Sequence, residues 1–133
     1  MVSAARPGVP STAVIGTRCD RLPAVNPRSA QELLAPLATQ QTDLGSGRRL
    51  IETYTMEGLL GLLWHGPLDA EDVVLCAAGG MGGYLGPADG LYTHLGSTLP
   101  ATGIAVVCVD YRRPSHLESS LLDLAATADR AVQ

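Results

Sequence analysis

Two sets of side chains alternate over residues 51–56, the two-residue period of a strand with one buried face. One set is Ile51, Thr53 and Thr55, and the other is Glu52, Tyr54 and Met56. Residues 59–64 follow as a more uniformly apolar run, and Met56-Glu57-Gly58 between the two runs is typical of a turn. The pattern therefore predicts an antiparallel hairpin over residues 48–64.

Two unbroken apolar runs come next, at residues 73–78 and 104–109. Such runs are typical of strands that a parallel sheet buries on both faces. Between them, Gly86-Pro87 predicts the start of a helix, and Pro100 with Gly103 predicts its end. Strand, helix and strand in this order predict a right-handed βαβ unit.

A last helix is expected after Pro114, where Ser115 and Glu118 have the spacing of a capping box. An apolar stripe runs from there to the end of the sequence. A parallel sheet would continue with another strand after such a helix, and these 133 residues encode none. The predicted fold class is α/β: an antiparallel hairpin joined to a parallel βαβ unit, flanked by helices.

Residues 1–47 show no sustained periodicity and contain five of the nine prolines. Ser29 and Glu32 predict one short helix, which Pro36 would stop. This segment carries four Arg and three acidic residues, whereas residues 48–133 carry five Arg and ten acidic residues. We therefore expect a disordered or weakly structured leader over residues 1–47 and one globular unit over residues 48–133.

The composition excludes several function classes. A net charge of -4 argues against a nucleic acid or an anionic membrane as partner. All nine basic residues are Arg, so a P-loop lysine, a Schiff-base lysine and a Ser-Lys dyad are ruled out. The three cysteines form no zinc-binding cluster, and we expect neither a metal nor a cofactor.

The compartment is expected to be cytoplasmic. Cys76 and Cys108 lie in apolar runs, where reduced thiols act as small hydrophobic groups. No stretch has the roughly 20 apolar residues that cross a bilayer, and residues 1–29 lack the apolar core of a secretory signal.

Glycines cluster at residues 79–86, directly after the first apolar run and before a predicted helix. Ligands bind at this position in open α/β sheets, because backbone N–H groups meet a helix N-terminus there. Three hypotheses fit: an oxyanion hole for acyl transfer, a dinucleotide site with Asp110 on the ribose, or a tight connection without a ligand. The dinucleotide hypothesis lacks the G-x-G-x-x-G register, since Leu85 stands where the third glycine would be.

The order of these motifs resembles the N-terminal part of an α/β-hydrolase, over residues 48–133. The segments that carry the resemblance are Ala77-Ala-Gly-Gly-Met-Gly-Gly83, Gly86-Pro87, Gly90-Leu-Tyr92, Gly103-Ile104 and Val109-Asp-Tyr-Arg-Arg-Pro114. The resemblance implies a serine hydrolase fold acting on a small ester-like or amide-like substrate. It implies an oxyanion site made by the N–H groups of Gly79, Gly80 and Met81, in a pocket lined by Gly82, Gly83 and His116.

Two departures from that family bear on activity. Alanines stand at 77 and 78, where a histidine often precedes the glycine pair, and the chain contains no G-x-S-x-G nucleophile elbow. We therefore expect that this polypeptide has no catalytic residue of its own and is inactive alone.

Other assignments compete with these hypotheses. The first apolar strand would be left at a sheet edge, which favours a noncatalytic interaction module that self-associates through this edge. Asp110 is expected to bond to nearby backbone or to pair with Arg112 or Arg113. His94 is expected to be a partly exposed helix residue, and His116 is expected to cap the last helix and to be solvated. No serine has an adjacent base in the sequence.

Overall fold

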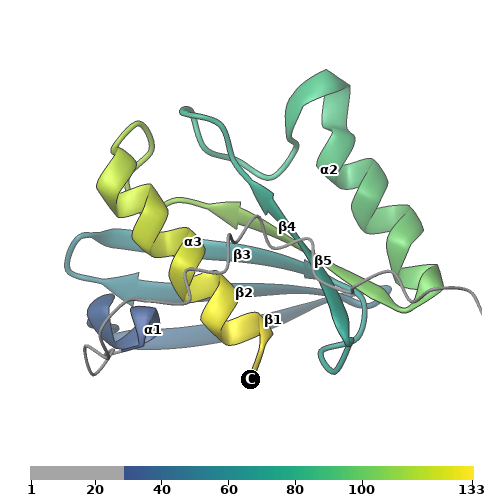
Figure 1. Cartoon of the computed structure of the whole chain (residues 1–133), viewed down its shortest axis with the longest axis horizontal. Helices are drawn as coiled ribbons and strands as arrows, with labels where there is room; N and C mark the ends of the chain where they lie inside the picture. Colours follow the sequence, from purple (N-terminus) through teal and green to yellow (C-terminus); the bar gives the residue numbers. More distant parts are fainter. Residues whose placement is uncertain (1–28) are drawn as a thin grey trace, which may run out of the picture.

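Five strands form one mixed sheet in the order β1-β2-β3-β5-β4 in the computed structural model, which describes residues 29–133 (Figure 1). The first three strands and β5 pair in antiparallel fashion, and β4 lies parallel to β5. The bounds are β1 Ala38–Gly45, β2 Arg48–Thr55, β3 Gly58–His65, β4 Asp72–Ala77 and β5 Ile104–Asp110.

The predicted hairpin is confirmed, and so are the element order and the parallel pairing of the predicted βαβ unit. Strands β2 and β3 pair over their full length, with Ile51 opposite Leu62. Strand β5 is the second strand of the parallel pair and also pairs with β3, so it has a neighbour on each side. Its five inner residues are buried, as expected for a strand covered on both faces.

The expectation that the first strand of the pair is buried on both faces is wrong, whereas its position at a sheet edge was expected. Strand β4 has only β5 as a neighbour among the described residues and stands at the edge of the sheet. Cys76 is its one buried residue, while Leu75 keeps 37% of its surface exposed. An apolar run alone does not distinguish a central strand from an edge strand, because the pattern reports composition rather than the presence of a neighbour.

The sheet begins before residue 48, inside the segment for which the sequence predicts little structure. A single helical turn, α1 (Ala30–Leu33), has Ser29 as its N-cap, with the Ser29 hydroxyl accepting the Glu32 N–H as the capping box predicts. Strand β1 then pairs with β2. Its side chains are almost all exposed, which explains why it has no hydrophobic pattern. The rest of the expected leader, residues 1–28, lies outside the described residues.

Helices cover both faces of the sheet. Helix α3 (Leu117–Ala131) lies across the strands in Figure 1 and packs with α1 over the face that contains Ile51, Leu62 and Val107. Helix α2 (Pro87–Thr98) packs over the opposite face, against Val106. None of the helices in residues 29–133 combines the length and apolar character needed to cross a membrane.

The two ends of α2 differ. A 3-10 turn, η1 (Leu99–Thr102), and a left-handed Gly103 end it at the predicted place. At its start, Ala88, Asp89 and Gly90 have φ values of 50°, 55° and 101°, so regular helical backbone begins only at Leu91. Proline at the first position predicts where the segment starts but not this left-handed turn.

Candidate functional site

The glycine-rich segment forms a loop, residues 78–86, at the carboxyl ends of the parallel strands β4 and β5. A tight turn organises it: the Gly82 N–H donates to the Gly79 carbonyl at 2.9 Å. Gly82, Gly83 and Gly86 have φ values of 75°, 93° and 75°. Glycine adopts this left-handed backbone without the strain that a side chain would add. The sequence therefore uses its glycines to turn the chain sharply out of β4.

Side chains from β5, from α2 and from the segment before α3 hold this loop and the last residue of β4 in place. The Asp110 carboxylate at the end of β5 accepts the Gly83 N–H at 2.8 Å. The Ser115 hydroxyl, just before α3, donates to the Gly80 carbonyl at 2.5 Å. The Tyr92 hydroxyl of α2 donates to the Ala77 carbonyl at 2.6 Å. The loop is thus fixed by side chains that are distant in sequence, which makes its backbone a preorganised feature of the fold.

Three backbone N–H groups of this loop donate no hydrogen bond to another described residue. Within residues 29–133, no hydrogen bond uses the N–H of Gly79, Gly80 or Met81. All three residues are exposed, and the Met81 side chain extends into solvent with 92% of its surface exposed. Three consecutive N–H groups without an internal acceptor are available to an anion or a polarised carbonyl oxygen.

Tyr84 belongs to the same loop, and the sequence analysis did not single it out. Its hydroxyl packs directly on Gly61 of β3, which is paired with Asp110 across the sheet. Burial, followed by the charges of Asp110 and Glu52, raises the pKa of Tyr84 to about 12. The phenol therefore stays protonated at neutral pH and cannot serve as a base. The glycine within β3 was the available signal, because a strand glycine often marks the close approach of another group.

The start of α3 departs from the expected capping box. His116, not Ser115, is the N-cap residue, and its side chain makes no capping bond. Ser115 has a left-handed φ of 66° and turns its hydroxyl to the glycine loop instead. The His116 side chain is exposed.

Two hollows bear on the candidate site. A small hollow of about 50 Å³ lies between α1, α3 and the sheet, with Leu34, Leu62 and Thr127 among its lining residues. A wider groove follows the first turns of α2 and includes Leu85 and Gly86 at the end of the glycine loop. Neither hollow is lined by the residues expected to bind an oxyanion or to line its pocket: Gly79, Gly80, Met81, Gly82, Gly83 and His116. The pocket role of these residues stays a prediction.

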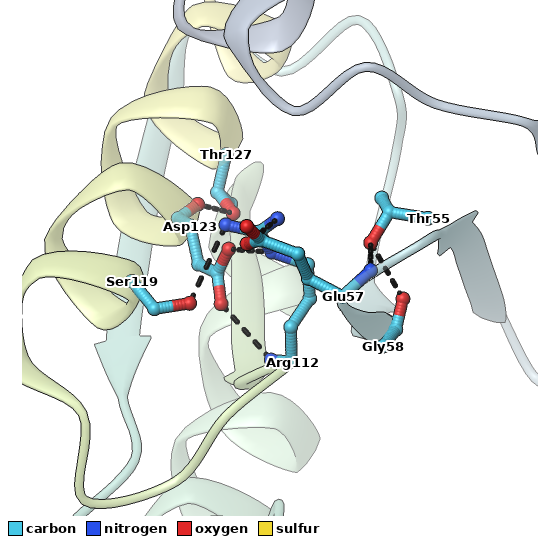
Figure 2. A network of polar contacts seen from close by, with 7 residues as sticks. All are labelled: Thr55, Glu57, Gly58, Arg112, Ser119, Asp123 and Thr127. Atoms are coloured by element: carbon cyan, nitrogen blue, oxygen red, sulfur yellow. Dashed lines mark hydrogen bonds and ion pairs between the residues drawn. The ribbon is translucent and has the colours of Figure 1, made fainter.

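A buried ionic network fixes the chain just beyond β5 (Figure 2). The Arg112 Nε donates to Asp123 Oδ1 at 2.6 Å, and the Arg112 backbone N–H donates to Asp123 Oδ2 at 2.9 Å. The same guanidinium reaches Glu57 at 3.2 Å and Ser119 at 3.4 Å. The sequence suggested that Asp110 either bonds to nearby backbone or pairs with an arginine. The structure has the bond to backbone, and Arg112 pairs with Asp123 instead.

The remaining candidate residues are not brought together in the described part of the chain. His94 is exposed on α2, as expected. Residues 29–133 contain no group of three or more His, Cys, Asp or Glu side chains arranged to hold a metal ion.

Comparison with known proteins adds no family assignment. No protein-family model matches the chain, and neither a curated protein nor a solved structure matches it significantly.

Proposed function

We propose that the glycine loop is the oxyanion-binding part of an α/β-hydrolase-like acyl-transfer domain. In such a reaction a nucleophile attacks an ester-like or amide-like carbonyl carbon, and the carbonyl oxygen gains negative charge. The N–H groups of Gly79, Gly80 and Met81 would donate to that oxygen and stabilise the charge as it develops. The nucleophile and its base would come from polypeptide other than these 133 residues, because the sequence holds no nucleophile elbow.

The main support is the set of three N–H groups without an internal acceptor, on a loop braced from β5, α2 and the start of α3. Preorganisation matters because donors that are already fixed need no reorganisation when charge develops. The loop also lies at the carboxyl end of a parallel strand pair, where open α/β sheets bind their ligands. The mixed strand order with an antiparallel hairpin beside this pair agrees with the resemblance found in the sequence.

The direct test is amide NMR on the ¹⁵N-labelled chain, titrated with a soluble alkyl phosphonate as a tetrahedral anion. We expect saturable shifts at Gly79, Gly80 and Met81, with Gly83 unaffected because its N–H already donates to Asp110. Sodium chloride at equal ionic strength is the control for screening. Unmoved signals at all three residues would refute the proposal.

Ser115→Ala probes the brace on Gly80, and Ser97→Ala is its matched control. Ser97 also donates its hydroxyl to a carbonyl, that of His94, but on the exposed side of α2. Losing one such bond costs about 1 kcal/mol, so Ser115→Ala should weaken phosphonate binding about fivefold. Equal effects of the two substitutions would contradict a role for the brace.

The proposal also requires that the chain alone has no activated serine. A serine-directed fluorophosphonate should leave its mass unchanged, and stoichiometric covalent labelling would show that a nucleophile had been overlooked.

The edge position of β4 favours a second candidate, a module that self-associates by strand pairing. An edge strand offers unpaired backbone groups to another strand, and the exposed Leu75 adds apolar surface. Sedimentation velocity should then show association that rises with concentration and is lost in Leu75→Lys. Leu44→Lys, on the opposite edge strand β1, is the matched control. A monomer at every concentration would exclude this candidate.

A further inference from the structure

Two cysteines face each other inside the sheet. Cys76 of β4 and Cys108 of β5 are register partners on neighbouring parallel strands, so their side chains point to the same face. Both are buried, with 3% and 1% of their surface exposed, and both belong to the apolar cluster beneath α2. This juxtaposition is invisible in the sequence, where 31 residues separate the two cysteines.

The strand spacing suits a covalent bond between them. Neighbouring strands lie about 4.8 Å apart, within the roughly 4.4–6.8 Å between Cα atoms that disulfides span. The side chains of paired residues run parallel rather than converging, so a disulfide here would be strained. Strained disulfides are more easily reduced than relaxed ones, which suits a reversible bond rather than a permanent one.

The two thiols also differ in acidity. A hydrogen bond from Cys108 lowers the pKa of Cys76, while the same bond and burial raise the pKa of Cys108. Cys76 therefore becomes the thiolate first, and the thiolate is the form that reacts with an oxidant.

We propose that Cys76 and Cys108 form a reversible dithiol–disulfide pair that responds to hydrogen peroxide. The Cys76 thiolate attacks one peroxide oxygen, the O–O bond breaks, and hydroxide leaves, so that Cys76 becomes a sulfenic acid. The Cys108 sulfur then attacks the Cys76 sulfur, the S–O bond breaks, and the hydroxyl leaves as water with the thiol proton. In total, two thiols lose two electrons and two protons, and one peroxide becomes two waters.

Access to the buried pair comes from the edge position of β4. This strand pairs only with β5 among the described residues, so local opening of one ladder, together with the part of α2 that packs over it, exposes Cys76 to a small oxidant. The inference does not depend on the proposed oxyanion site. The pair nevertheless lies directly below the glycine loop, since Gly79 follows Cys76 by three residues and Asp110 follows Cys108 by two.

The experiment uses the full chain carrying Cys19→Ser, so that only the two paired cysteines remain. The chain is treated with hydrogen peroxide, alkylated, and digested with chymotrypsin, which can cut between the cysteines at Tyr84 and Tyr92. Disulfide formation removes two hydrogens, so before alkylation the intact mass should lie about 2 Da below that of the reduced chain with the same methionine oxidation. The peptides containing Cys76 and Cys108 should stay linked until dithiothreitol is added.

Controls separate this result from general oxidation. With Cys108→Ser added, the loss of about 2 Da should disappear, and a dimedone adduct should appear on Cys76 instead. Met81, which is 92% exposed, reports when peroxide has reached an oxidising dose. Methionine sulfoxide at Met81 with both thiols intact would overturn the proposal, as would sulfinic acid on either cysteine without any linked peptide.

Discussion

Single residues of the glycine loop differ sharply in how much change they should tolerate. A Cβ added at Gly82 would lie 2.7 Å from Asp110 Oδ1, and its φ of 75° is left-handed. A Cβ at Gly79 would meet nothing within 4 Å, and no left-handed φ constrains that residue. The glycines that shape the loop are therefore distinct from those that present free N–H groups.

Gly82→Ala should destabilise the fold by about 2 kcal/mol, from left-handed strain together with the displaced Asp110 carboxylate. Gly79→Ala should stay within about 0.5 kcal/mol of the parent chain. Urea unfolding followed by far-UV circular dichroism measures both. If Gly79→Ala destabilised the fold as much as Gly82→Ala, the left-handed backbone at Gly82 would not be what limits substitution in this loop.

His65 makes the stability depend on pH. Its ring is buried, its Nε2 has no hydrogen-bond partner within residues 29–133, and a Cβ on Gly96 of α2 would lie only 2.7 Å from the ring. Burial, followed by the charge of Arg48, lowers the pKa of His65 below 6.5 in the folded state. The unfolded chain therefore binds a proton more readily than the folded chain does.

The stability linked to His65 is fully present above pH 6.5 and is lost as the pH falls through the folded-state pKa. Unfolding free energies measured from pH 7.5 down to pH 4.5 should show this decline. His65→Gln should flatten that part of the profile, whereas His94→Gln, on the exposed side of α2, should keep it. An unchanged slope in His65→Gln would assign the pH dependence to another group.

Among the elements, α3 is held to the sheet in two different ways. Its first turns leave Leu117 and Leu121 exposed by 72% and 56%, whereas Ala126 further along is buried. The Arg112–Asp123 pair therefore supplies the attachment that apolar packing lacks near the start of the helix (Figure 2).

Asp123→Ala should cost about 3–5 kcal/mol, because it leaves the Arg112 guanidinium buried without its partner. Glu57→Ala removes the other carboxylate on the same guanidinium, but the Glu57 side chain is 61% exposed, so we expect a loss below about 1 kcal/mol. Chemical denaturation of both variants gives the comparison. Similar losses would show that burial does not set the strength of this network.

The sequence predicted the elements whose pattern arises from burial and missed those held by backbone bonds alone. The hairpin and β5 were identifiable because their apolar residues pack in the core. Strand β1 was missed because its ladder with β2 needs no buried side chain. The braces on the glycine loop could not be predicted either, since Ser115 is 35 residues from Gly80 and a local capping motif offered a simpler role for it.

At the scale of the whole molecule, β5 joins two apolar clusters that lie on opposite faces of the sheet. Val107 and Val109 belong to the cluster under α1 and α3, and Val106 and Cys108 to the cluster under α2. Opening either layer leaves β5 covered on its other face, so the β5 amides that pair with β3 should become free only when the whole domain unfolds. Strand β1 lies at an edge and lacks a buried side chain, so local opening is enough to release it.

Hydrogen exchange should therefore be slowest in β5 and in the facing part of β3, and faster in β1 by about a hundredfold or more. Mass spectrometry of exchanged peptides resolves these strands. Repeating the measurement at a tenfold lower protein concentration serves as the control, because protection of β4 that comes from self-association would fall on dilution while that of β5 would not. Equal protection of β1 and β5 would mean that the sheet opens as one unit, and that the two clusters do not stabilise β5 beyond its neighbours.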